Sequence, residues 1–109
     1  MRGSAPKKTG VEIRNDTESP TRPMTNTERW AARIVAASRA GHMVSYEEEA
    51  LTVLNGEPIA VDLETSLCRE AAALNHRMCD DEHAVYEANE KLASVLEEFG
   101  LADRWGAQQ

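Results

Sequence analysis

Four side chains with metal-binding chemistry follow one another at helical spacing: His76, Cys79, His83 and Glu87. In a helix, steps of three or four residues place all four on one flank, and their ligand types suit Zn²⁺. Side chains stacked along one straight helix cannot surround a single ion tetrahedrally, however, and no CxxC pair accompanies them. The other cysteine, Cys68, lies eleven residues before Cys79 and therefore does not form a CxxC pair with it. We therefore expect no metal site and no cofactor.

Nucleophilic chemistry has equally little support in the sequence. Ser66, Cys68 and His76 lie close together, but Ser66 and Cys68 are two positions apart and would point to different faces of a helix. Nucleophilic catalysis needs a base, an orienting third group and a pocket. The sequence contains no glycine-rich phosphate loop, GxSxG or HExxH motif. We expect no catalytic residues and a protein that is not an enzyme.

Charge is distributed unevenly along the 109 residues. Residues 1–44 hold eight Lys/Arg and four Asp/Glu, whereas residues 45–109 hold four Lys/Arg and fifteen Asp/Glu, which gives the net charge of −7. An acidic body repels phosphate backbones and attracts basic surfaces, so nucleic acid is an unfavoured partner and a protein with a basic surface is a favoured one. The alternative is that the acidity only keeps a small protein soluble.

Two acidic clusters are the candidate partner-binding sites: a first acidic cluster of Glu47, Glu48 and Glu49, and a second acidic cluster of Asp80, Asp81 and Glu82. The first follows Ser45, which with Glu48 forms a capping-box pattern, and it lies where a helix dipole favours negative charge. The second has three interpretations: a solvated face, the N-cap of a separate last helix, or a surface for a basic partner.

An apolar seam organises the C-terminal half. Its members recur at steps of three and four residues, with one step of seven across Asp81: Leu67, Ala71, Leu74, Met78, Val85, Ala88, Leu92, Val95 and Phe99. This spacing indicates one side of a helix. The stretch is either one helix of roughly 55 Å or two helices that meet near Asp81. No Gly or Pro lies between Asp62 and Phe99, which favours a single or kinked helix, capped by Asp62 or Thr65.

Two shorter helices are expected before this stretch. Thr25 and Glu28 form a capping box that begins a helix over residues 26–40, ended by Gly41, with Trp30 and Ile34 on its inner face. A second helix should follow Ser45 and end at Asn55-Gly56, with a short strand conceivable over residues 59–61. The predicted fold class is all-α, with two short helices packed on a long or kinked C-terminal helical segment.

The chain divides into a flexible basic arm, residues 1–23, and an acidic helical domain, residues 24–109. The arm is rich in Pro, Gly, Ser and Thr and has few apolar side chains to offset its ordering entropy. No apolar run approaches the ~20 residues that cross a bilayer, and no secretory signal begins the chain. We expect a cytoplasmic protein without a membrane segment, with Cys68 and Cys79 reduced.

The leading hypothesis is a non-enzymatic protein-binding regulator or inhibitor. If the two short helices cover only the first half of the seam, the 85–99 part stays open, so Val85, Leu92 and Val95 become partner-binding candidates for another protein or a second copy of the chain. One form of this idea is an inhibitor whose carboxylates replace phosphates at a nucleic-acid-binding site of its target.

The alternative from a different class is a dimeric helix-turn-helix-like DNA-binding regulator. It would use the basic arm and the arginines of the first helix, Arg29, Arg33 and Arg39. A helix-turn-helix can be drawn from 46–55 through a turn to 61–74, but its second helix opens with Asp62 and Glu64, whose charge has the wrong sign for phosphates.

Overall fold

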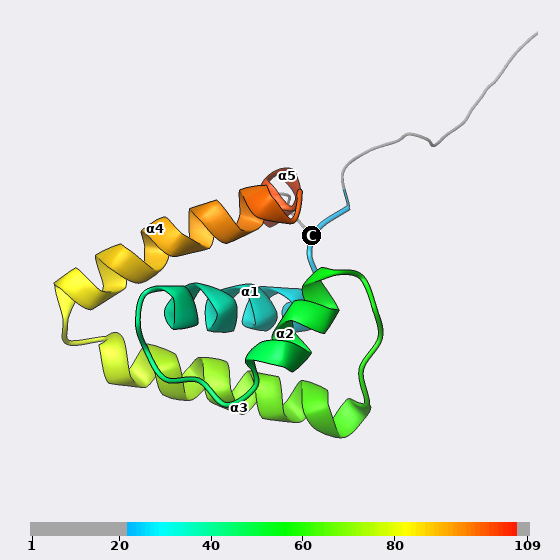
Figure 1. Cartoon of the computed structure of the whole chain (residues 1–109), viewed down its shortest axis with the longest axis horizontal. Helices are drawn as coiled ribbons and strands as arrows, with labels where there is room; N and C mark the ends of the chain where they lie inside the picture. The colour runs from blue at the N-terminus through cyan, green and yellow to red at the C-terminus, as the bar shows by residue number, and fades with distance from the viewer. Residues whose placement is uncertain (1–21, 107–109) are drawn as a thin grey trace, which may run out of the picture.

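The computed structural model describes residues 22–106, and this part of the chain contains helices and no strand. The helices are α1 (Asn26–Arg39), α2 (Glu47–Leu54), α3 (Val61–Met78), α4 (Glu82–Glu98) and α5 (Ala102–Trp105) (Figure 1). The predicted all-α class is thereby confirmed. Residues 1–21, which make up nearly all of the expected flexible arm, lie outside the described residues.

Helix α1 begins and ends as its sequence predicts. The Thr25 hydroxyl accepts a hydrogen bond from the Glu28 N–H, and the Glu28 carboxylate accepts one from the Thr25 N–H, at 3.1 and 2.8 Å. This capping box satisfies backbone donors that the first turn leaves free. The helix is followed by Gly41 at φ +99°, a left-handed conformation that glycine adopts readily and that residues with a Cβ atom disfavour.

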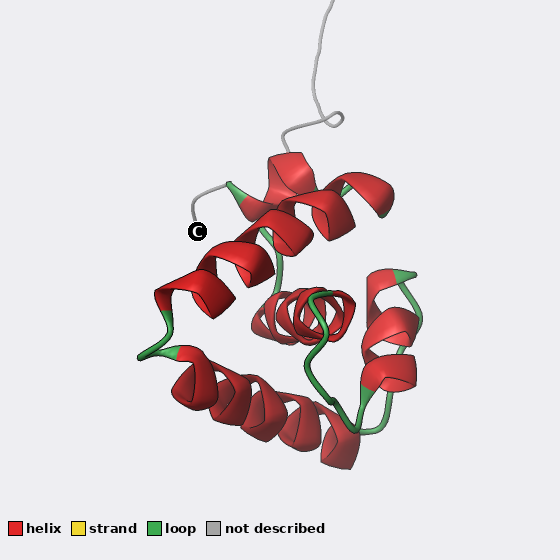
Figure 2. Cartoon of the chain, turned by 60° about the vertical axis from the view of Figure 1, so that its left-hand side comes forward, coloured by secondary structure: helices red, strands yellow, loops and turns green. Residues whose placement is uncertain are grey.

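Helices α2, α3 and α4 pack around α1. Figure 2 looks nearly along α1 and shows α2, α3 and α4 on three sides of it. Six α1 residues are buried: Ala31, Ala32, Ile34, Val35, Ala36 and Ala37. Trp30, expected on the inner face, is only partly buried, whereas Met24 just before the helix is completely buried. The core is therefore built on α1, with the C-terminal helices as its cover.

The C-terminal segment consists of two main helices, the second of the two alternatives that the sequence left open. α3 ends at Met78, three residues turn the chain, and α4 begins at Glu82. Asp81 has an extended backbone, and its Oδ1 accepts a hydrogen bond from the Ala84 N–H at 3.1 Å. An N-cap residue can begin a new helix without Gly or Pro in the turn, because its side chain replaces the missing helical acceptor.

Two other predicted helix starts differ in the structure. The Ser45–Glu48 capping box does not form: Tyr46 precedes α2 without a side-chain cap, and the Glu70 carboxylate of α3 accepts the Ser45 and Tyr46 N–H groups at 2.6 and 3.0 Å. Neither Asp62 nor Thr65 caps α3, which begins directly after Ala60. Glu70 thus binds two N–H groups that precede α2, and its contact replaces the one that Glu48 would have made with the Ser45 N–H in a capping box.

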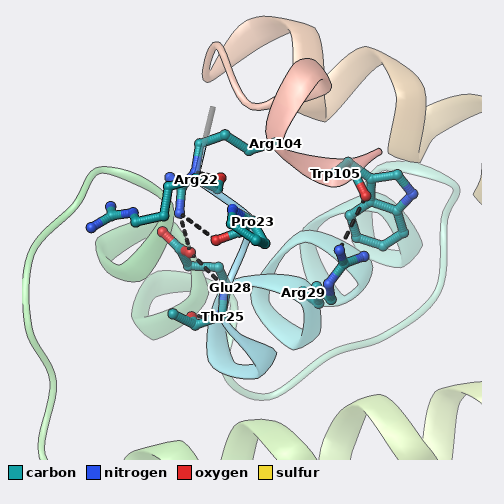
Figure 3. A network of polar contacts seen from close by, with 7 residues as sticks. All are labelled: Arg22, Pro23, Thr25, Glu28, Arg29, Arg104 and Trp105. Carbon is teal, nitrogen blue, oxygen red and sulfur yellow. Dashed lines mark hydrogen bonds and ion pairs between the residues drawn. The ribbon is translucent and has the colours of Figure 1, made fainter. Parts of the chain in front are cut away.

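The two ends of the described chain are tied together by Arg104 of α5 (Figure 3). Its guanidinium donates to the Glu28 carboxylate at 2.7 Å and to the Arg22 and Pro23 carbonyl oxygens at 2.9 and 3.4 Å. Burial by itself raises the pKa of the Glu28 carboxyl, but hydrogen bonds from Thr25 and Arg104 and the Arg104 charge outweigh it and lower this pKa overall.

The Asp81 cap predicts different effects for two substitutions. Asp81→Ala removes the acceptor of the Ala84 N–H and should destabilise the protein by about 1 kcal/mol. Asp81→Asn keeps an oxygen acceptor and should cost only a few tenths of a kcal/mol. Urea unfolding followed by circular dichroism measures both, and equal losses for the two variants would show that the charge, and not the cap, matters.

The Glu28 contact predicts a dependence of stability on pH. Because the folded pKa lies below the unfolded value, the stabilisation is complete above about pH 4.5 and is lost as the pH falls through the folded pKa. Glu28→Gln should lower stability near neutral pH by on the order of 1–3 kcal/mol. It should also reduce the acid-induced loss of stability, and parallel pH profiles for wild type and variant would contradict this account.

Candidate functional site

A cleft of about 250 Å³ opens between α3 and α4 near the turn that joins them. Its lining residues are Arg33, Ala36, Ala71, Leu74, Asn75, Met78, Val85, Ala88, Asn89 and Leu92. The two helices diverge from their common turn, with α1 between them (Figure 1). Helices α1, α3 and α4 each contribute one alanine to the lining: Ala36, Ala71 and Ala88. Their short side chains leave the space between the diverging helices unfilled.

Each helix wall of the cleft presents both an apolar and a polar group. Met78 on α3 and Val85 on α4 supply accessible apolar surface, and Asn75 on α3 and Asn89 on α4 supply exposed amides. Val85 is 37% exposed although it belongs to the apolar seam. A concave apolar surface with a few polar groups around it is the usual form of a binding site.

The second acidic cluster lies directly beside this cleft, because Asp80 and Asp81 belong to the turn after Met78 and Glu82 is the first residue of α4. Asp80, Asp81 and Glu82 are all exposed. The Asp81 carboxylate caps α4, which gives a structural reason for a charge within the seam. Among the hydrogen bonds and ion pairs of the described part, none engages the side chain of Asp80 or Glu82.

The first acidic cluster occupies a different place. It forms the first turn of α2, which lies beside α1 and away from the turn between α3 and α4 (Figure 2). Glu48 is exposed, whereas Glu47 and Glu49 are partly buried. Carboxylates in a first helical turn interact favourably with the helix dipole, so this cluster has a stabilising role that needs no partner.

Three members of the seam were candidate partner-binding residues, and the structure places them differently. Leu92 is 8% exposed and Val95 is fully buried, because α4 folds back onto α1. The expectation that the chain leaves the 85–99 part of its seam open is therefore corrected at these two residues. Val85, nearer the turn, is still accessible at the cleft.

An ion pair fixes the returning helix. Arg39, the last residue of α1, forms a two-pronged contact with Glu98, the last residue of α4, in which Nη2 and Oε2 lie 3.3 Å apart. The hydrogen bond from Arg39 lowers the pKa of the Glu98 carboxyl. The contact joins the C-terminal ends of α1 and α4, and because the two side chains are 35% and 50% exposed, solvent partly screens the pair.

The residues with metal-binding chemistry are separated by the turn. Cys79 donates its thiol hydrogen to the His76 carbonyl oxygen at 3.2 Å, while His83 contacts Glu87 at 3.4 Å on α4. Within residues 22–106, no three His, Cys, Asp or Glu side chains come together as a metal-binding group. Cys68 and Cys79 are not joined by a disulfide.

The arginines of α1 contact other helices. Arg29 donates to the Trp105 carbonyl oxygen at 3.1 Å (Figure 3). The guanidinium carbons of Arg29 and Arg33 lie 4.7 and 5.2 Å from the centre of the Trp105 ring. Arg39 binds Glu98. These cation–π and ion-pair contacts join α1 to α4 and α5.

Sequence reasoning identified Met78, Leu74 and Val85 as seam residues but missed Asn75 and Asn89. Each asparagine directly follows a seam residue, Leu74 or Ala88, and so flanks the apolar side of its helix. The presence of one asparagine beside the seam before Asp81 and one after it is the only feature of the sequence that could have pointed to these two residues. Their position on two walls of one cleft depends on the chain reversal at residues 79–81.

Within residues 22–106, no helix combines the length and the apolar character needed to cross a bilayer. Comparisons of the chain with protein-family models, curated proteins and solved structures returned no match.

The contrast between Leu92 and Val85 yields a prediction about stability. Leu92→Ala removes a buried side chain from the contact with α1 and should lower the free energy of unfolding by about 2–5 kcal/mol. Val85→Ala, at the cleft edge, should cost less than about 1 kcal/mol. Denaturant unfolding of both variants measures the difference. A larger loss for Val85→Ala would mean that the seam is covered in another way.

Proposed function

We propose that this chain is a non-enzymatic protein-binding regulator that engages a basic surface of its partner through the second acidic cluster. Support comes from the position of exposed Asp80 and Glu82 at the edge of an apolar cleft with accessible Val85. Interfaces commonly combine an apolar centre with a polar rim, and this part of the molecule offers both elements.

Electrostatic attraction would act mainly on the rate of association. The chain carries a net charge of −7, and its acidic residues are concentrated after residue 44. Such a field steers a basic partner towards the protein and is screened over about 8 Å at physiological salt. The apolar contact would then determine how long the complex lasts, because close packing acts chiefly on dissociation.

An inhibitor is the most specific form of this proposal. Carboxylates that occupy the place of phosphates would block a nucleic-acid-binding site on the target. The helix-turn-helix alternative is disfavoured by the contacts of Arg29, Arg33 and Arg39, since each already binds or stacks on another helix of the same chain. A phosphate backbone would have to compete with these contacts.

Neutralising two acids at each cluster tests the proposal. The partner is first identified by pull-down from the native host. Asp80→Asn with Glu82→Gln should then weaken binding by about tenfold, because a partner cation loses its counter-charges. Glu47→Gln with Glu48→Gln removes the same charge at another helix start and should leave affinity within about twofold of wild type. Surface plasmon resonance at several salt concentrations measures both rates.

The salt dependence gives the second readout of this experiment. Raising salt should slow association of the wild type far more than it speeds dissociation. The Asp80/Glu82 variant should show a shallower salt dependence, and circular dichroism should show unchanged helix content. Equal affinity for both double variants and wild type at low salt would refute a role for either cluster.

A further inference from the structure

We infer that the α3–α4 cleft binds an extended peptide segment of the partner, with an apolar side chain in the cleft and a Lys or Arg facing Asp80 and Glu82. This inference rests on the proposed function and specifies the partner's chemistry. It depends on three features of the described residues: the size of the cleft, the two asparagines, and the position of the acidic turn.

The size of the cleft suits a side chain better than a whole small-molecule ligand. Its volume of about 250 Å³ lies below the ~300–1,000 Å³ of typical small-molecule pockets. Met78 and Val85 supply accessible apolar walls for a side chain such as Leu, Ile or Phe, with the buried Leu74 behind them. Ala36 and Ala88 leave the space that this side chain would fill. Burying it would remove apolar surface of both molecules from water.

The two asparagines favour an extended backbone over a helix. A side-chain amide both donates and accepts hydrogen bonds, so it can pair with the N–H and C=O groups of one peptide unit. An extended segment has these groups free, whereas a helix has already satisfied nearly all of them. Asn75 and Asn89 are exposed on different helices of the cleft and can therefore hold such a segment from two sides.

The acidic turn sets the charge of the segment. Asp80 and Glu82 lie between the cleft residues Met78 and Val85, so a chain leaving the cleft at this end passes their carboxylates. A Lys or Arg there would be attracted, and an acidic residue would be repelled. Arg33 also lines the cleft, but its guanidinium lies 5.2 Å from the centre of the Trp105 ring and so is directed to α5.

Charge also argues against the acidic helices of a second copy of the chain as the occupant. Two molecules that each carry −7 repel each other, and residues 45–109 hold only four Lys/Arg beside fifteen acids. A dimer across this cleft would bring two acidic turns close together. A basic segment of a different protein therefore fits the surface better.

Synthetic peptides of about ten residues, long enough to span roughly 33 Å when extended, provide the direct probe. One peptide places Leu or Phe at its centre with Lys and Arg beside it, a second replaces the apolar residues by Ser, and a third replaces Lys and Arg by Glu. Fluorescence anisotropy with the full chain should show binding of the first peptide at least tenfold tighter than that of the other two.

Filling the cleft tests the site without changing charge. Ala88→Phe places a large side chain in the cleft and should weaken binding of the first peptide at least tenfold. Ala93→Phe, at an exposed position of the same helix that does not line the cleft, is the matched control and should bind within about twofold of wild type. Circular dichroism confirms that both variants keep their helices.

A second variant tests the backbone contact if Ala88→Phe fails to fold. Asn75→Ala with Asn89→Ala should weaken the first peptide about tenfold, since each hydrogen bond contributes a few-fold. A peptide of the same sequence locked as a helix should bind more weakly than the flexible one. Tighter binding of the locked helix, with no effect of the asparagine variants, would overturn the extended mode.

The remaining outcomes separate this inference from the proposed function. If Ser- and Leu-containing peptides bind equally well, or if Ala88→Phe has no effect, the cleft is not the site and the inference fails. The proposed function would still stand if neutralising Asp80 and Glu82 weakened binding of the whole partner. Sedimentation equilibrium that showed a dimer dissociated by Ala88→Phe, but not by Ala93→Phe, would identify a second copy as the occupant and also overturn the inference.

Discussion

The fold depends on the burial of one helix, α1, by three others. Helix α1 presents mostly alanines to its surroundings, with Ile34 and Val35 as its larger apolar residues. Small side chains allow neighbouring helices to approach closely, so α2, α3 and α4 can all contact α1. This arrangement positions the other elements. The chain must reverse direction after α3 so that α4 can reach α1. Helix α5 lies where the guanidinium groups of Arg29 and Arg33 contact the Trp105 ring.

Charged side chains then fix the ends of the helices. Glu70 satisfies backbone donors before α2, Arg39 joins the ends of α1 and α4, and Arg104 joins α5 to Glu28. Part of the protein's acidity therefore has a structural use. Among the second acidic cluster, Asp81 caps a helix and Glu82 lies in the first turn of α4, where the helix dipole favours a negative charge. Asp80 and Glu82 form no hydrogen bond or ion pair within the described residues, so their carboxylates are free to meet a partner.

The candidate site is a consequence of how the helices diverge. α3 and α4 meet at a three-residue turn and separate on either side of α1, and alanines line the space between them. Larger residues at these positions would close the cleft, and their absence leaves apolar walls accessible beside an acidic turn. Recognition by this surface would combine electrostatic attraction over a long distance with packing at short distance.

The sequence by itself determined the helical class, the boundaries of α1 and the members of the apolar seam. These features depend on local rules: capping boxes, a left-handed Gly41 and a spacing of three and four residues. Asp81 as the N-cap of a last helix was one of three interpretations that these rules allowed. Choosing among them required knowing that α4 folds back onto α1.

Only the tertiary structure decided which part of the seam is covered and which residues line the cleft. Periodicity shows that Val85, Leu92 and Val95 share a face, but not that α1 buries the last two and leaves the first accessible. The sequence likewise could not show that Glu70, twenty-five residues after Ser45, would accept the N–H groups of Ser45 and Tyr46 just before α2. Both outcomes depend on contacts between distant segments, which form only when the whole chain packs around α1.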